Sequence, residues 1–187
     1  MILGLDISTT CTGWSIIDCS GSLVAQGFIP LSNLDNLFKK AGKVQQELTE
    51  IHKSNSITTV AIEENLQAFR PGLSSARTLL TLARFNGIVS YICENVFGVQ
   101  PSFINVNTAR KSLGLKIIKK SKGGAPAKEQ VMEWVSSEIP GYPWPVKTLK
   151  SGPRKGLEIL SPGCYDTADA YVIARAYVEM NKQVLSM

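Results

Sequence analysis

The sequence predicts an α/β protein with a five-stranded mixed sheet, in which the first three strands are antiparallel and helices cover both faces. Two observations lead to this fold class. Three apolar runs separated by short turns open the chain, and from residue 34 onward helical patterns alternate with further apolar runs. The 187 residues are enough for one domain with a sizeable core. We therefore expect a single domain over residues 1–187, with residues 139–163 as a loop insertion.

The N-terminal part is predicted to form an antiparallel meander. Strands are expected at residues 2–7, 13–18 and 23–29, and the Ser20-Gly21 pair between the last two is typical of a hairpin turn. Residues 34–53 then show the helical spacing of apolar side chains. The strand expected next follows a helix, so a right-handed crossover would bring it parallel to the first strand.

The rest of the chain alternates between helices and strands until the composition changes. The long helix expected at residues 74–97 contains small residues, which would let it approach a partner subunit. Packing of this helix on its own sheet is an equal alternative. Residues 139–163 are rich in proline and glycine, which is loop composition. The elements expected from here on are strand 58–63, helix 74–97, strand 102–106, a short helix capped by Thr108, helix 127–138 and a final helix 166–182.

The charge of the chain is unevenly distributed. Residues 110–155 carry eleven Lys or Arg against three Glu, whereas the whole chain has a formal net charge of +5. The remainder is therefore acidic, and the basic sector indicates a polyanionic partner such as nucleic acid. A solvated lysine-rich loop is the simpler alternative.

The cysteines and the apolar segments exclude several classes. No pair of the four cysteines has the C-x-x-C spacing of a metal or redox site, so reduced thiols in a cytoplasmic protein are expected. If the source is viral, this would be the host cytoplasm. No signal peptide is visible, and no segment approaches the length of a membrane span.

Four acidic residues are the candidate catalytic groups. Asp6 and Glu63 each end an apolar run, and Asp166 and Asp169 lie three apart at the start of the final helix. Carboxylates at strand ends cost desolvation energy unless a charge compensates them. Clustered oxygen ligands are typical of Mg²⁺, which points to metal-assisted phosphate chemistry. Alternatively, Asp166 is a helix cap, Asp169 interacts with the helix dipole, and Glu63 ends a strand at the surface.

Five segments of the chain form a set whose order and spacing are informative. They are Ile2-Leu3-Gly4-Leu5-Asp6, Thr12-Gly13-Trp14, Val60-Ala61-Ile62-Glu63, Ala127-Lys128-Glu129-Gln130-Val131 and Asp166-Thr167-Ala168-Asp169-Ala170. Together they resemble the RuvC family of Holliday junction resolvases in the ribonuclease H-like superfamily. The similarity covers roughly residues 1–138 and 164–182.

The resemblance implies a ribonuclease H-like fold and a set of functional residues. Asp6, Glu63, Asp166 and Asp169 would be the catalytic carboxylates holding two Mg²⁺ ions per active site, with Mn²⁺ as a substitute. Some relatives have a histidine near the position of Asp166 or Asp169. Lys128 would contact the scissile region. The protein would be a homodimer, with helix 74–97 at the interface, and each subunit would nick one of two symmetry-related strands.

DNA contacts are expected from two further regions. In the family an aromatic side chain after the glutamate probes the junction centre. Here Leu66 or Phe69, the latter preferred and followed by Arg70, would wedge between bases, or both would be local core. Phosphate contacts are expected from the basic sector. Its candidates are Arg110, Lys111, Lys116, Lys119, Lys120, Lys122 and Lys128.

The insertion at 139–163 departs from the family pattern. Its Tyr142 and Trp144 would stack on exposed bases or pack a dimer edge. The slightly favoured alternative is that they pin the loop to the body of the protein.

The function predicted from these residues is a Mg²⁺-dependent, structure-selective endonuclease that resolves four-way DNA in recombination and repair. A broader branched-DNA or flap endonuclease is the first alternative. Asp6-Ile7-Ser8-Thr9-Thr10 also resembles the phosphate loop of sugar kinases and actin-like ATPases. Those proteins need a second domain, so no nucleotide cofactor is expected here. A junction-binding protein without cleavage is disfavoured, because a pure binder gains nothing from carboxylates that repel phosphate.

Overall fold

The computed structural model describes residues 1–64 and 76–182. It contains a five-stranded sheet in the order β3-β2-β1-β4-β5. The strands β1, β2 and β3 pair antiparallel, whereas β4 runs parallel to β1 and β5 parallel to β4. The predicted fold class is therefore confirmed. The strand bounds are β1 (Ile2–Ile7), β2 (Cys11–Ile17), β3 (Leu23–Pro30), β4 (Thr59–Glu63) and β5 (Ser102–Ile104).

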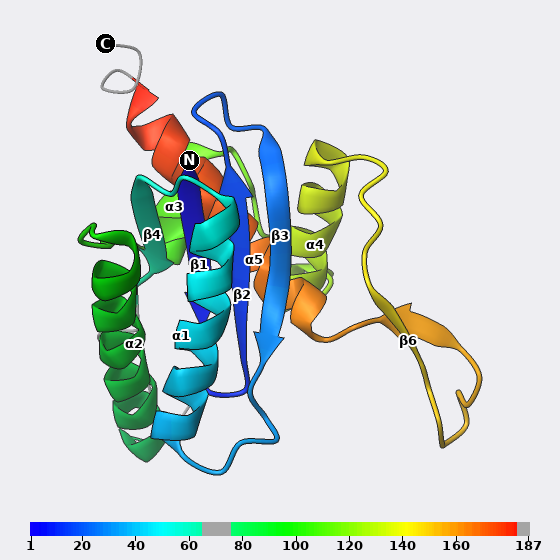
Figure 1. Ribbon diagram of the computed structural model, residues 1–187. Helices are drawn as coiled ribbons and strands as arrows, with labels where there is room; N and C mark the ends of the chain where they lie inside the picture. Colours follow the sequence, from blue (N-terminus) through cyan, green and yellow to red (C-terminus); the bar gives the residue numbers. More distant parts are fainter. Residues whose placement is uncertain (65–75, 183–187) are drawn as a thin grey trace.

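Helices cover both faces of this sheet, as Figure 1 shows. Two of them, α1 and α2, lie on one face, and the other three lie on the opposite face. Their bounds are α1 (Leu37–Ser54), α2 (Ala76–Phe97), α3 (Val106–Ser112), α4 (Ala127–Glu138) and α5 (Gly163–Met180). None of the helices described has both the length and the apolar character needed to cross a bilayer.

The alternation of side chains along β1 separates the two cores. Leu3 and Leu5 are fully buried in the core beneath α1 and α2. Ile2 packs into the second core, beneath α5, and Gly4 and Asp6 share its face because side chains alternate along a strand. Two layers of helices around one sheet thus leave Asp6 on the α5 side.

Helix α5 lies in direct contact with the strands because two glycines leave room for it. A Cβ atom on Gly4 would come within 2.3 Å of the carbonyl oxygen of Ala170. One on Gly13 would come within 2.0 Å of the carbonyl oxygen of Asp166. Any side chain at these positions would push the helix away from the sheet, so the glycines fix the height of α5 above β1 and β2.

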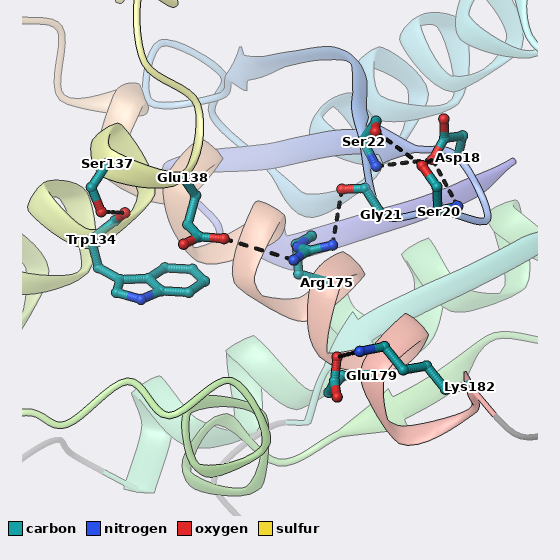
Figure 2. A network of polar contacts seen from close by, with 10 residues as sticks. All are labelled: Asp18, Ser20, Gly21, Ser22, Trp134, Ser137, Glu138, Arg175, Glu179 and Lys182. Carbon is teal, nitrogen blue, oxygen red and sulfur yellow. Dashed lines mark hydrogen bonds and ion pairs between the residues drawn. The ribbon is translucent and has the colours of Figure 1, made fainter.

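The C-terminal half of α5 is held by a polar network. Arg175 donates to the carbonyl oxygen of Gly21 at 3.1 Å and forms an ion pair with Glu138 at 3.7 Å (Figure 2). Gly21 lies in the β2–β3 turn, in which Asp18 accepts from the backbone N–H groups of Ser20 and Ser22, both at 2.9 Å. One arginine thus ties α5 to the β2–β3 turn and to the end of α4.

Several local predictions differ from the structure; α1, for example, begins at Leu37 and not at residue 34. Helix α3 is capped by Asn105, which accepts from the N–H of Asn107 at 3.0 Å, and not by Thr108. Helix α5 begins at Gly163, earlier than expected, because the chain turns into the helix directly after Pro162. The segment 139–163 is not only a loop, since it contains a two-stranded antiparallel ribbon of β6 (Val146–Thr148) and β7 (Glu158–Leu160).

Candidate active site

Asp6 and Glu63 stand at the carboxyl ends of neighbouring parallel strands. Leu5 of β1 is in register with Ile62 of β4, so the next residue on each strand is an acid. Both acids lie on the sheet face that α5 covers, because Ala61, two residues before Glu63, packs in the α5 core. The prediction that these two strand ends would be adjacent is confirmed.

Asp166 and Asp169 approach the same place from the first turns of α5. Asp6 pairs with Gly13 across β1 and β2, and it is Gly13 that the backbone of Asp166 touches. The spacing of three puts Asp166 and Asp169 on one face of the helix. Three segments far apart in the sequence therefore deliver carboxylates to one edge of the sheet.

The four carboxylates lie in a common electrostatic field. Burial raises the pKa of Asp6 well above its usual value, and the negative charges of Glu63, Asp169 and Asp166 raise it further. Burial and the charge of Asp169 raise the pKa of Glu63 to about 7. Burial is also the main cause that raises the pKa values of Asp166 and Asp169. The site thus concentrates negative charge that the protein alone compensates only in part.

Two basic residues provide this partial compensation. From α3, Arg110 donates from Nη2 to Oδ1 of Asp169 at 3.4 Å, and both side chains are largely buried. Arg110 lowers the pKa values of Asp169 and Glu63, which burial raises. Lys128, exposed on the first turn of α4, acts in the same direction on Asp6, Asp166 and Asp169. Lys128, the basic residue expected beside the scissile region, therefore lies within electrostatic reach of three of the carboxylates.

The donor set suits a hard divalent cation. Carboxylate oxygens are the ligands that Mg²⁺ prefers, and a buried excess of negative charge favours a bound cation. Within residues 1–64 and 76–182, however, no three His, Cys, Asp or Glu side chains are placed close enough together to hold one ion. The four carboxylates interact electrostatically, but their oxygens are not arranged to coordinate one ion. Their side chains would therefore have to rotate when a metal binds.

A hollow of about 220 Å³ opens beside the first two acids. Asp6, Ser8, Glu63 and Glu64 line it on one side, and Leu79 and Leu82 of α2 form part of the other. The three predicted DNA-binding residues of the segment after β4 lie outside the described residues. These are Leu66, Phe69 and Arg70.

Much of the basic sector gathers next to Arg110. A groove of about 430 Å³ runs along α3 and the chain that follows it. Lys120 and Lys122 lie exposed in the 3₁₀ helix η1 (Lys120–Lys122), outside the lining of the groove. The structure thus brings four predicted phosphate-binding residues together on one surface. These four lining residues are Arg110, Lys111, Lys116 and Lys119.

The lysine-rich loop, residues 115–125, is held in place by one side chain of α4. Gln130 accepts from the N–H of Ile118 at 2.8 Å and donates to the carbonyl oxygens of Ile118 at 2.9 Å and Ala125 at 2.6 Å. Gly124 packs tightly on the Ile118 carbonyl, where a Cβ would lie at 2.1 Å. The lysines therefore project from a fixed backbone, which reduces the entropy lost on binding a phosphate chain.

The sequence-based reasoning missed Cys11. Its thiol forms a hydrogen bond with Asp166, which lowers the pKa of that carboxyl, while burial and the acid raise the pKa of the thiol. A signal was available, since Cys11 lies two residues before Gly13 on β2 and therefore on the same face. Gln130 was quoted as part of a motif, but its clamping role depends on contacts with a loop that sequence spacing does not reveal.

The described strands and helices form an α/β domain with a ribonuclease H-like fold. No family model matches the chain, and no curated protein matches its sequence. Among solved structures, RuvC of Thermus thermophilus in complex with a Holliday junction substrate is similar, with a TM-score of 0.65 and 18% identity over 97% of this chain and 95% of that chain.

Two further structures agree with this comparison. A second T. thermophilus RuvC structure has a TM-score of 0.62 and 19% identity, covering 98% of this chain and 96% of that one. The yeast mitochondrial Holliday junction resolvase Ydc2 has a TM-score of 0.54 and 13% identity, covering 98% and 79%. At these identities the likeness concerns the fold. The particular fold is that of RuvC, and the resemblance drawn from the sequence motifs is confirmed at this level.

Proposed function

We propose that this protein is a Mg²⁺-dependent, structure-selective DNA endonuclease that resolves four-way junctions by paired, symmetric nicks. One observation carries the proposal. Four carboxylates from β1, β4 and α5 lie within electrostatic reach of one another at one edge of the sheet, beside a groove lined by four basic residues. The basic residues would bind the phosphate backbone of DNA, and the acids would hold the metal ions that support its cleavage. We expect this activity in the cytoplasm, of the host if the source is viral.

The residues that would hold the metal are Asp6, Glu63, Asp166 and Asp169. Two Mg²⁺ ions bound there would supply an activated water and neutralise charge on the leaving oxygen. The protein's own groups would position the DNA. Lys128 is exposed and close enough to lower the pKa values of three of the acids, so a phosphate bound beside them would interact with its ammonium group. Arg110 belongs both to the carboxylate site and to the basic groove, so it would hold the DNA backbone at the point where the two meet.

A homodimer is part of the proposal because two symmetric nicks need two sites. The outer face of α2 supports it. Leu80 and Tyr91 are 60% and 67% exposed. Ala83 and Gly87 between them are exposed as well, and a Cβ on Gly87 would meet no atom within 4 Å. Small and apolar side chains on one exposed helix face allow a second helix to approach closely, as expected for an interface between two copies.

The test is incubation with four-way, flap, nicked and linear DNA, in Mg²⁺ or in chelator, with the Asp6→Asn variant as the matched control. The proposal predicts paired nicks in the four-way junction with Mg²⁺ only, leaving ligatable 5′-phosphate and 3′-hydroxyl ends. Equal or preferred cutting of flaps would favour the broader branched-DNA nuclease. Tight junction binding without any nick in Mg²⁺ or Mn²⁺ would contradict the proposal.

A further inference from the structure

The β6–β7 ribbon stands away from the body of the protein, between α4 and α5 (Figure 1). Its base is nevertheless fixed. The N–H of Ser161 donates to the carbonyl oxygen of Pro145 at 2.9 Å, and the thiol of Cys164 donates to the same oxygen at 3.3 Å. Cys164 lies in the first turn of α5, two residues before Asp166. The ribbon is therefore tied to the helix that carries two of the acids.

Aromatic residues strengthen this anchor. The hydroxyl of Tyr142 donates to the carbonyl oxygen of Gln26 on β3 at 3.3 Å, and its ring meets that of Trp144 edge to face at 4.9 Å. Trp144 also packs against the α5 core. Of the three roles considered for these aromatics, the pinning of the segment to the body is the one these contacts support. The β6–β7 ribbon is thus an arm whose base is fixed to the body of the protein, and not a free loop.

The outer part of the ribbon is ordered by backbone pairing and is strongly basic. The N–H of Leu149 donates to the carbonyl oxygen of Leu157 at 3.0 Å, which continues the pairing of β6 and β7 toward the tip. Among the residues that the structure describes, no acid forms an ion pair with any of the four cations of the ribbon. Residues 146–160 carry one acid, Glu158, and these four exposed cations: Lys147, Lys150, Arg154 and Lys155.

The dimensions of the ribbon suit a DNA groove. The paired part of the ribbon, from Pro145 to Leu149, spans about 13 Å at roughly 3.3 Å per residue. The major groove of duplex DNA, about 12 Å wide, admits a two-stranded ribbon. Gly152 and Gly156, with φ angles of 78° and 88°, form the tight turns at the tip. Cations without internal partners on a narrow arm of this length match a phosphate backbone better than a protein surface.

The position of the arm relative to the acids completes the argument. The sheet order β3-β2-β1-β4-β5 places the arm, which rests on β3, on one side of Asp6 and Glu63. The basic groove, built on α3 next to β5, lies on the other side. A duplex that crosses the carboxylate site would therefore meet positive charge on both sides.

We propose that the β6–β7 ribbon is a DNA-binding arm that enters a groove of the duplex flanking the scissile phosphate and holds its backbone. This inference rests on the proposed function, which supplies the DNA at the carboxylate site. It adds a contact surface outside the carboxylate site and the α3 groove.

The test uses a variant in which three cations at the tip, Lys150, Arg154 and Lys155, are replaced by glutamine. Binding to a four-way junction and to a linear duplex is measured against salt concentration, in chelator so that no strand is cut. The salt slope is the steepness with which the logarithm of the binding constant falls with the logarithm of the salt concentration, and each lost phosphate contact lowers it by about 0.9. The slope should therefore fall by about two to three, and the affinity at low salt should fall by more than tenfold. Junctions whose arms are shorter than one helical turn should show little difference. The variant is K150Q/R154Q/K155Q.

A matched control removes the same charge from elsewhere. It replaces Lys43, Lys53 and Lys182, which pair with nearby acids on α1 and at the end of α5, away from the arm. The control should keep the wild-type slope for long-armed junctions. A second variant replaces residues 149–157 by Asn-Gly, whose type I′ turn preserves the β6–β7 pairing, and thermal melting checks that both ribbon variants fold. The control variant is K43Q/K53Q/K182Q.

The outcomes separate the two proposals. If both ribbon variants bind long-armed junctions as tightly and with the same slope as the control, the arm does not contact DNA and the inference is overturned. The same holds if they lose only association with another protein, the outcome that exposed Val146 and Leu157 would favour. If the ribbon variants lose affinity for linear duplex but the wild type shows no preference for junctions and no nicking, the arm is supported and the proposed function fails.

Discussion

Replacing Glu63 by glutamine should stabilise the metal-free protein at neutral and alkaline pH. Folding raises the pKa of Glu63 from 4.5 to about 7, through burial and the charge of Asp169. The unfolded chain therefore gives up this proton first, and stability falls as pH rises from 4.5 through 7. Each pKa unit corresponds to about 1.4 kcal/mol, so at pH 8 the ionised carboxylate costs about 3 kcal/mol, which the neutral amide avoids.

The assay is denaturant unfolding in chelator at pH 5 and pH 8, with Glu133→Gln on the exposed face of α4 as the control. The Glu63→Gln variant should gain about 3 kcal/mol at pH 8 and less than about 1 kcal/mol at pH 5, where folded wild type still holds the proton. The control should change little at either pH. Added Mg²⁺ should stabilise wild type more than the variant. An equal gain at both pH values, or none at pH 8, would refute the electrostatic reasoning.

Three further predictions test the site, its support and its DNA surface. Asp6→Asn should abolish nicking in Mg²⁺ while junction binding in gel-shift experiments is unchanged, and normal nicking by this variant would refute its catalytic role. Gly13→Ala should destabilise the protein by about 1–3 kcal/mol in thermal melting, because a Cβ there would lie 2.0 Å from the backbone of α5. Gly42→Ala on α1, where nothing lies within 4 Å of the added Cβ, should be stabilising by up to about 1 kcal/mol. The double variant K120Q/K122Q should lower the salt slope of junction binding by about two, and an unchanged slope would exclude phosphate contacts by η1.

The sheet and the position of the acids were predictable because burial leaves a clear pattern in the sequence. Apolar runs that end in Asp6 and Glu63, joined through a helix, specify two parallel neighbours with their acids at one edge, and the structure has this arrangement. Helix 127–138 was predicted with the bounds that α4 has, since its apolar spacing is regular. Helix α5 was expected to begin at Asp166 because acids are common in first turns, and the true start at Gly163 carries no such signal.

The rest depends on contacts that local patterns do not encode. The strands β6 and β7 were missed because β6 is exposed throughout, so no burial alternation marks it, and the prolines around it are typical of loops. The ion pair of Arg110 with Asp169 joins residues 59 positions apart, and composition could say only that Arg110 belonged to a basic sector. The tightness of Gly13 against α5 likewise appears only when the helix is in place.

The most direct measurement of the central claim is anomalous scattering from crystals of the protein soaked in Mn²⁺. The account predicts two ions, about 4 Å apart, among the carboxylate oxygens of Asp6, Glu63, Asp166 and Asp169, with those side chains rotated toward them. If the same preparation nicks junctions while no Mn²⁺ is bound by these four residues, the chemistry lies elsewhere and the account is contradicted.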